Sequence, residues 1–119
     1  MSKAFDTVKH SSLMPKYAQL LPNLLYIWQV DFYTFRTHTT IFEGKESKKA
    51  AINASVIQGS VIGPISFAVN MIDLHPIDPN NFLFKYADDC YLITTGKNGA
   101  TIPSEIENIN SWCKKATLN

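Results

Sequence analysis

The sequence predicts an α+β domain in which an antiparallel sheet is covered on one face by helices. Stretches in which apolar residues recur at helical spacing alternate with short β-branched or aromatic stretches. Two of the latter are separated by only three residues, which is typical of a β-hairpin. With 119 residues, 45% of them hydrophobic, the chain is long enough for one domain with a core of its own.

The N-terminal part of the chain predicts the end of a strand, over residues 4–8, followed by two helices. Ser11 or Ser12 can cap the first helix, which runs to about residue 21 and has Pro15 in its first turn. The second helix follows over residues 22–36. The positions expected to face the core are Leu13, Tyr17 and Leu20 or Leu21 in the first helix, and Leu24, Ile27, Trp28, Asp31 and Phe35 in the second.

The middle of the chain predicts two strands and a third helix. Residues 37–42 form the first strand because they are rich in threonine and β-branched side chains. A turn at residues 43–47 separates it from a second strand over residues 51–56. Gly63 and Pro64 then open an apolar helix that runs to residue 73.

The C-terminal part predicts a hairpin and a last helix. Apolar, aromatic runs at residues 82–86 and 90–94 are separated by Ala87, Asp88 and Asp89, so the hairpin turn carries two carboxylates. The last helix begins near residue 103, with acidic residues at its start and lysines at its end. Its expected inner face holds Ile102, Ile106, Ile109 and Cys113.

Composition and charge say little about partners. The net charge of +1 gives no whole-chain signal for nucleic acid or for an anionic membrane. Cys90 and Cys113 form neither a disulfide framework nor a metal cluster, so we expect an intracellular, reducing compartment, either nucleus or cytoplasm. No stretch approaches 18 uninterrupted apolar residues, and no membrane contact is expected.

Asp88 and Asp89 are the first candidates for chemistry. Adjacent aspartates are common turn formers, which is the structural alternative. At the tip of an apolar hairpin, however, two carboxylates offer the hard oxygen ligands that Mg²⁺ prefers. Joined by a third carboxylate from elsewhere, they predict a phosphoryl-transfer site.

The second candidate is the loop over residues 58–64, between a strand and a helix. Gly59 would allow a positive φ or the close approach of a ligand, and Gln58 offers both a donor and an acceptor. The loop is not a Walker loop, because no Gly-Lys-Ser/Thr follows. A purely structural role in starting the helix at Pro64 is equally open.

Three stretches of the chain are more informative in combination than singly. They are Ser2-Lys-Ala-Phe-Asp-Thr-Val-Lys-His10, Gln58-Gly-Ser-Val-Ile-Gly-Pro64 and Lys85-Tyr-Ala-Asp-Asp89. In this order they resemble the palm domain of a reverse transcriptase, an RNA-directed DNA polymerase, from a non-LTR, LINE-like retrotransposon. Trp28, Phe32, Arg36, Asp73-Leu74 and Trp112 also fit the pattern of the family, as does the closing Leu118-Asn119. The resemblance spans residues 1–119, read as one partial palm domain.

The resemblance implies a role for each matching residue. Asp88 and Asp89 match the paired aspartates that hold Mg²⁺, or Mn²⁺, for two-metal transfer of a dNTP to a primer 3′-hydroxyl on an RNA template. Phe5 matches the bulky residue that excludes ribonucleotides. The residues implied to lie near the nucleotide and template are Gln58, Gly59, Ser60 and Tyr86, and those implied to support the structure are Asp6, His10, Arg36, Gly63 and Pro64.

The departures from the family pattern predict little or no activity for the chain alone. The third metal-binding aspartate of the family would fall immediately before Met1, and a lysine of the family pattern would follow Asn119. The fingers and thumb that hold template and primer are also missing from the match, so weak or no nucleic-acid binding is expected. Two alternatives remain: a non-catalytic relic or weak nucleic-acid-binding module, and an unrelated α+β domain with a fortuitous Asp-Asp turn.

Overall fold

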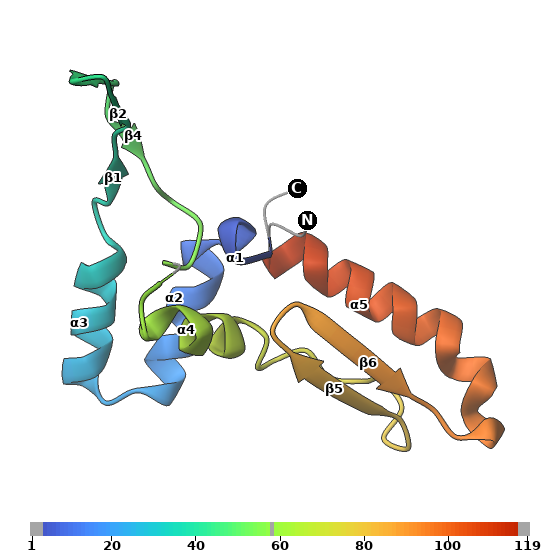
Figure 1. Cartoon of the computed structure of the whole chain (residues 1–119). Helices are drawn as coiled ribbons and strands as arrows, with labels where there is room; N and C mark the ends of the chain where they lie inside the picture. The colour runs from blue at the N-terminus through green and yellow to red at the C-terminus, as the bar shows by residue number, and fades with distance from the viewer. Residues whose placement is uncertain (1–3, 58, 117–119) are drawn as a thin grey trace.

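The computed structural model describes residues 4–57 and 59–116. The chain is elongated, with principal extents of 62 × 36 × 21 Å. Its radius of gyration is 17.4 Å, compared with about 13.5 Å expected for a compact domain of this length. Helices α1 to α4 gather at one end, a β-ribbon projects from them, and a hairpin with the last helix forms the other end (Figure 1).

The N-terminal residues form a helical turn, α1 (Ala4–Thr7), so the strand predicted there is wrong. The hydroxyl of Thr7 donates to the carbonyl of Ala4 at 3.1 Å, which closes the turn locally. A strand needs a partner along its whole length. This segment receives only scattered bonds, such as that from the Val56 amide to the Phe5 carbonyl at 2.8 Å, before an isolated bridge pairs Lys9 with Ala54.

Helix α2 (His10–Leu20) buries Leu13 and Tyr17, as predicted. It begins earlier than expected, so Pro15 lies inside the helix instead of in its first turn. Leu20, offered together with Leu21 as the next core position, is exposed, whereas Leu21 is partly buried against the core.

Helix α3 (Asn23–Tyr33) ends before Arg36, and its predicted core face is wrong. The helix buries Gln29 and Tyr33, whereas its expected core residues face solvent. The exposed positions are Leu24, Ile27, Trp28 and Asp31, together with Phe35 beyond the helix end. Because apolar residues occur on almost every side of α3, their spacing did not single out the inward side.

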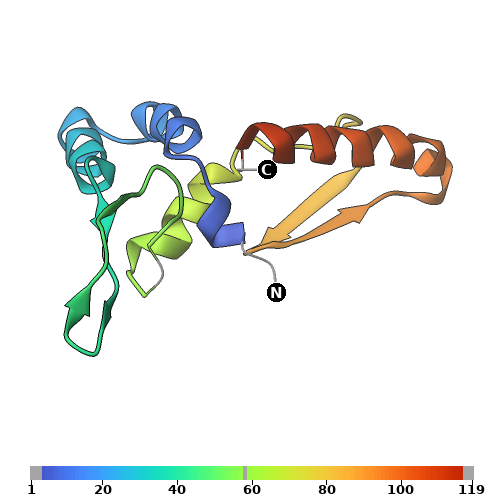
Figure 2. The same cartoon turned by 90° about the horizontal axis from the view of Figure 1, so that it is seen from above.

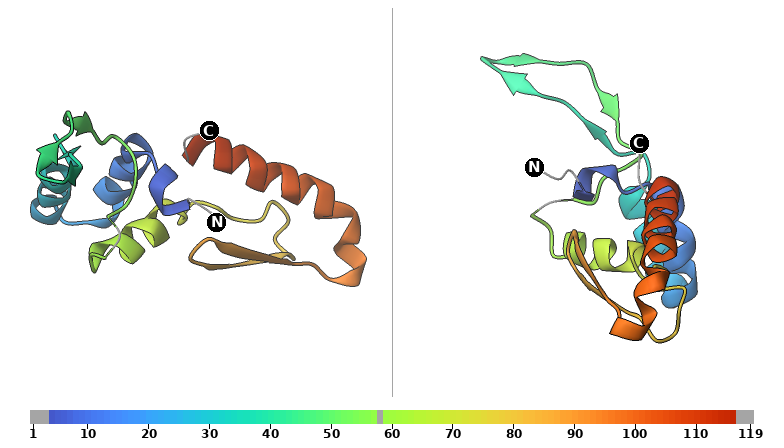
Figure 3. Two further views of the ribbon diagram at one scale, coloured as in Figure 1. Left: turned by 45° about the horizontal axis from the view of Figure 1, so that its top comes forward. Right: turned by 90° about the vertical axis from the view of Figure 1, so that its right-hand side faces the viewer.

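The projecting ribbon contains four very short strands (Figures 1 and 3). Strand β1 (Thr37–His38) pairs with β4 (Ala50–Ala51), and β2 (Ile41–Phe42) pairs with β3 (Lys45–Glu46). The turn predicted over residues 43–47 is shorter than expected: Glu43 and Gly44 alone form it, with φ values of 47° and 73°. Two successive positive φ angles are typical of the type I′ turn that joins tight hairpins.

The core lies where α2 and α4 (Ile62–Asn70) cross. The buried apolar side chains that form it are Val8, Leu13, Tyr17, Tyr33, Val56, Phe67, Met71 and Leu74. Ser66 sits among them with no exposed surface, and its hydroxyl lies 2.7 Å from the hydroxyls of both Tyr17 and Tyr33. Burial raises the pKa of both tyrosines, against the opposing effect of the Ser66 hydrogen bond.

The other end of the molecule is the hairpin of β5 (Phe82–Tyr86) and β6 (Asp89–Ile93), followed by η1 (Gly96–Thr101) and α5 (Ile102–Ala116). Helix α5 runs alongside the hairpin (Figures 1 and 2). Its predicted inner face is largely wrong, since Ile102, Ile106 and Cys113 are exposed. The inward positions are Glu105, Ile109, Trp112 and Ala116, which recur at i, i+4, i+7 and i+11.

The α+β class is confirmed, but the strands do not join in one sheet. The described residues form three separate two-stranded antiparallel ladders. The strand predicted over residues 37–42 is broken into two two-residue strands. Of the strand predicted over residues 51–56, only Ala51 lies in a strand and Ala54 makes an isolated bridge, so the described residues form no wide sheet for helices to cover. Across the described ranges, none of the helices has both the length and the apolar character needed to span a membrane.

Candidate active site

The hairpin that carries Asp88 and Asp89 forms as the sequence predicts, with a tighter turn. Tyr86 pairs with Asp89, so the turn consists of Ala87 and Asp88 alone, and Ala87 has a φ of 49°. Asp89 is therefore the first residue of β6 instead of part of the turn. The two carboxylates lie at the tip of the hairpin, one in the turn and one at the start of the strand.

The tip fits a divalent cation in part. Asp88 and Asp89 are both exposed, and within the described residues neither carboxylate makes a hydrogen bond or an ion pair. Mg²⁺ is usually held by one or two carboxylates together with water and substrate phosphates, so these two oxygen donors suit it. Over residues 4–57 and 59–116, however, no three His, Cys, Asp or Glu side chains gather as a metal-binding group.

The two faces of the hairpin differ strongly in exposure. Cross-strand pairing places Phe82 with Ile93, Phe84 with Tyr91 and Tyr86 with Asp89, and every one of these residues is exposed. The opposite face turns inward: Leu83 packs against the core, and Lys85 binds carbonyl groups. Both faces thus carry apolar side chains, but only the face with Leu83 and Lys85 is partly covered.

The loop before α4 is held by the Ser60 side chain. The Ser60 hydroxyl donates to the Ile57 carbonyl at 2.8 Å and accepts from the Gly63 amide at 3.1 Å. Gly59 has a φ of 81°, the positive value expected of it. Gln58, predicted to lie near the nucleotide, is outside the described residues. Helix α4 begins at Ile62, which places Pro64 in its first turn.

Gly63 lies so close to the backbone of Ile57 that there is no room for a side chain. A Cβ atom at this position would lie 2.5 Å from the Ile57 carbonyl oxygen. We expect Gly63→Ala to lower the free energy of unfolding by about 1–3 kcal/mol, because the loop or helix must move to relieve this overlap. Urea denaturation followed by circular dichroism measures the loss. Gly99→Ala is the matched control, since a Cβ there meets nothing within 4 Å; equal midpoints for the two variants would contradict the expectation.

Two of the predicted nucleotide-site residues, Phe5 and Tyr86, line one pocket of about 420 Å³. Phe5 stacks on Phe67, with ring centroids 4.4 Å apart. The pocket lies between α1, α4 and the end of β5, and its remaining lining residues are Pro64, Phe67, Ala68, Met71, Lys85 and Ala87. It therefore lies directly beside the hairpin turn.

Asp6, His10 and Arg36, predicted to support the structure, line a different groove of about 460 Å³. Nε2 of His10 donates to the Ser55 carbonyl at 2.8 Å, since a carbonyl can only accept. The Arg36 guanidinium donates to the Phe32 carbonyl at 3.2 Å and lies over the Phe32 ring. The His10 bond joins positions 45 residues apart, whereas both Arg36 contacts are local to the end of α3.

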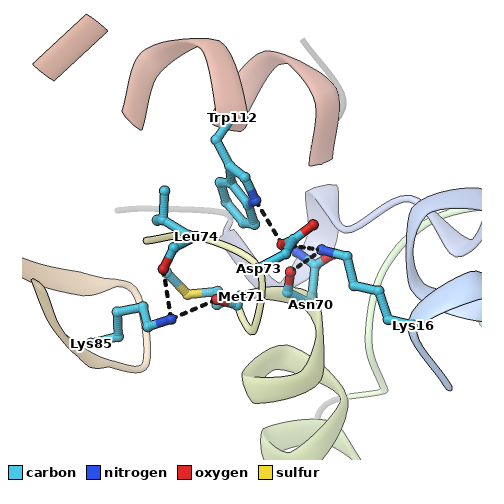
Figure 4. A network of polar contacts seen from close by, with 7 residues as sticks. All are labelled: Lys16, Asn70, Met71, Asp73, Leu74, Lys85 and Trp112. Atoms are coloured by element: carbon cyan, nitrogen blue, oxygen red, sulfur yellow. Dashed lines mark hydrogen bonds and ion pairs between the residues drawn. The ribbon is translucent and has the colours of Figure 1, made fainter. Parts of the chain in front are cut away.

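A polar network at the end of α4 was missed by sequence reasoning (Figure 4). Asp73 accepts from Lys16 Nζ at 2.7 Å and from Trp112 Nε1 at 2.8 Å. Lys85 Nζ donates to the carbonyls of Met71 at 2.7 Å and Leu74 at 3.0 Å. The sequence did contain one indication of the role of Lys85. Successive residues of a strand point to opposite faces, so Lys85 lies on the face of β5 opposite Phe84 and Tyr86.

The network shifts the pKa values of its members. Burial lowers the pKa of Lys85, because desolvation disfavours the ammonium form. Burial would raise the pKa of Asp73, but the hydrogen bonds from Lys16 and Trp112 outweigh it and the net shift is downward.

Comparison with known proteins gives a consistent result. A family model described as "Reverse transcriptase (RNA-dependent DNA polymerase)" matches residues 1–119. The "RNA-directed DNA polymerase from mobile element jockey" of Drosophila melanogaster is 33% identical over 105 residues, which cover 82% of this chain and 12% of that protein. The "Probable RNA-directed DNA polymerase from transposon BS" of the same organism is 30% identical over 129 residues, covering 99% of this chain and 14% of that protein.

The chain thus spans about an eighth of the length of these relatives. The resemblance to the reverse transcriptases of non-LTR retrotransposons, based on three short motifs, is confirmed at the level of the family. Since the family model covers every residue, the hairpin and the loop before α4 both lie within the matched region. The chain belongs to the reverse transcriptase family.

Proposed function

We propose that this chain is part of the palm of an RNA-directed DNA polymerase and that Asp88 and Asp89 are its metal-binding carboxylates. The observation that carries the proposal is the tight hairpin with two exposed carboxylates at its tip, beside a pocket lined by Phe5 and Tyr86. When bound, Mg²⁺ would activate a primer 3′-hydroxyl and stabilise the leaving pyrophosphate. The substrates of the whole polymerase would be an RNA template, a DNA primer and a dNTP.

The residues of this chain contribute the parts of a nucleotide site. Asp88 and Asp89 provide anionic oxygen ligands, for which Mn²⁺ would also serve. Phe5, fixed against Phe67, provides a rigid ring at the pocket wall. Ser60 orders the loop before α4 through its own hydrogen bonds, so its part is to shape that loop. Gly59, beside it, has open space where a side chain would be.

We expect little or no polymerisation by this chain alone. Two carboxylates without a third from the described residues leave a two-metal centre short of ligands. Phosphoryl transfer also depends on positioning the primer and template, which a net charge of +1 does little to attract.

The proposal is tested by Mn²⁺ binding, measured by electron paramagnetic resonance, and by primer extension on a homopolymer RNA template. We expect weak Mn²⁺ binding that the Asp88→Asn, Asp89→Asn double variant weakens at least about tenfold, because both carboxylate ligands are removed. Asp31→Asn, at an exposed site on α3, is the control. Mn²⁺ binding unaffected by the double variant would overturn the assignment. Template-dependent extension that Asp88→Asn abolishes would confirm the carboxylates and overturn the expected inactivity.

The second candidate function is weak binding of single-stranded nucleic acid without catalysis. The exposed aromatic side chains on the open face of the hairpin favour it, since such rings stack on bases. A gel-shift assay with labelled single-stranded RNA tests this candidate. A shift at low salt, together with no metal binding and no extension, would support it over the first. No shift at low salt would exclude it.

A further inference from the structure

The turn that follows α4 exposes a cluster of carbonyl groups that two lysines bind (Figure 4). Lys16, from α2, donates to the Asn70 carbonyl. Lys85, from β5, donates to the carbonyls of Met71 and Leu74. The last carbonyls of a helix lack partners within the helix and carry partial negative charge, so ammonium groups are favoured there.

This turn is itself braced by contacts from two other helices. Lys16 and Asp73 form an ion pair at 2.7 Å, and Trp112 of α5 donates to the same Asp73 oxygen at 2.8 Å. The Lys16 ammonium also lies 5.2 Å from the centroid of the Trp112 ring. The carbonyls that receive Lys85 are therefore fixed relative to α2 and α5 as well as to α4.

Lys85 connects this turn to the tip of the hairpin. It pairs with Cys90, in the register position next to the Tyr86–Asp89 pair that closes the turn. Asp88 follows three residues later, about 10 Å further along the chain. The outer face of the hairpin has no cover, so the inner face, through Lys85 and Leu83, holds the hairpin to the rest of the molecule.

Helix α4 carries a second functional segment at its other end. Its nine residues span about 13 Å, from the loop ordered by Ser60 and Gly63 to the turn that binds Lys85. The pocket that contains Phe5 lies along this helix. The distance between the loop and the hairpin tip is thus set through α4 and the contact that Lys85 makes with it.

We propose that Lys85 is a positioning residue that fixes the Asp88–Asp89 tip relative to α4 and the pocket beside it. The proposal rests on the proposed function, because it concerns the placement of the carboxylates assigned there. The Lys85 side chain lines the pocket, but its ammonium group binds the carbonyls of Met71 and Leu74. Its part is to hold the carboxylates and the loop before α4 in one geometry, which a phosphoryl-transfer site needs to within about 1 Å.

The test measures the position of the hairpin directly. A nitroxide on the exposed thiol of Cys113, in a Cys90→Ser chain, broadens backbone amide signals with the inverse sixth power of distance. In Lys85→Met, which keeps the alkyl stem and loses both hydrogen bonds, we expect the broadening at Asp88 and Asp89 to change by about twofold or more, because the tip is no longer held to the turn after α4. Broadening at Leu13 should stay constant.

Two control variants test whether the change comes from Lys85. Lys85→Arg, which retains donors, should restore most of the wild-type pattern. Lys97→Met, at an exposed site, should leave the wild-type pattern intact.

Unchanged broadening at the tip in Lys85→Met would overturn the proposal. So would global unfolding of Lys85→Met that Lys85→Arg fails to reverse, because Lys85 would then be a folding residue; urea denaturation of each variant reveals this. Mn²⁺ affinity separates the two proposals, since both carboxylates come from one hairpin and should bind equally well in Lys85→Met. If the wild-type chain binds no Mn²⁺, the proposed function fails, while the nitroxide measurement still decides the role of Lys85.

Discussion

The Glu105→Ala variant should unfold with a free energy about 3 kcal/mol smaller than that of the wild-type chain. Glu105 is 1% exposed, and its carboxylate accepts hydrogen bonds of 2.9 Å from the amides of Ile77 and Asp78 and from Asn81 Nδ2. Alanine would leave these three donors, of which Asn81 is buried, without an acceptor and would open a cavity beneath α5. Urea denaturation of the two proteins measures the difference.

Acid should remove part of this stabilisation in the wild-type chain. Burial alone would raise the pKa of Glu105, but the hydrogen bonds from Asp78, Asn81 and Ile77 outweigh it, and its pKa lies below the ordinary value of 4.5. The unfolded chain therefore binds the proton more readily, so the stabilisation is complete above pH 4.5 and is lost as the pH falls through the lowered pKa. Glu105→Gln should remove this pH dependence. Glu107→Gln, exposed on the same helix, should retain it; identical acid profiles for all three proteins would refute the assignment.

Replacing Ser66 by alanine should lower the free energy of unfolding by about 2–3 kcal/mol, because two buried tyrosine hydroxyls lose their partner at once. The Ser66 hydroxyl can donate to one of Tyr17 and Tyr33 and accept from the other, both at 2.7 Å. These side chains come from α2, α3 and α4, so the three hydroxyls join three helices at one buried point.

The matched control removes the hydroxyls together. A triple variant with Ser66→Ala, Tyr17→Phe and Tyr33→Phe contains no unpaired hydroxyl at this point, and we expect it to regain much of the stability lost in Ser66→Ala alone. Urea denaturation of the single and triple variants gives the free energy by which the Ser66 hydroxyl is coupled to the two tyrosine hydroxyls. A triple variant less stable than Ser66→Ala would show that the tyrosine hydroxyls have partners other than Ser66.

The sequence predicted the parts of the structure that local signals determine. The hairpin at residues 82–93 was predicted because two aromatic runs flank a short polar turn, and Leu13 and Tyr17 were placed in the core by helical spacing. The positive φ of Gly59 also follows from a local requirement. The order of the three motifs was sufficient to indicate the family.

Tertiary contacts decided what the sequence could not show. Glu105 begins the inward stripe of α5, and a charged residue there hides the stripe from any search for apolar periodicity. Its partners are backbone amides of residues 77 and 78, which have no signature in the sequence. In α3 the difficulty is that apolar residues occur on nearly all sides, so their spacing does not predict which side is buried. The structure buries Gln29 and Tyr33.

The candidate site was predictable in its components but not in its geometry. Asp88, Asp89, Phe5 and Tyr86 were named from motifs, and the structure brings Phe5 and Tyr86 to one pocket. The positions of Asp6, His10 and Arg36 in a separate groove depend on how residues 52–57 return to α1 and α2. Alternation along β5 indicated the face on which Lys85 lies, but not its partners, because these are backbone carbonyl groups without a signature in the sequence.

The elongated shape of the chain determines how its stability responds to temperature. Its accessible surface of 8583 Å² is about a third larger than the roughly 6500 Å² expected of a compact protein of this mass. Less apolar surface is therefore newly hydrated on unfolding, and the heat capacity change stays below the roughly 1.6 kcal/mol/K typical of this chain length. A small heat capacity change flattens the curve of free energy against temperature, so cooling this protein adds little to its stability.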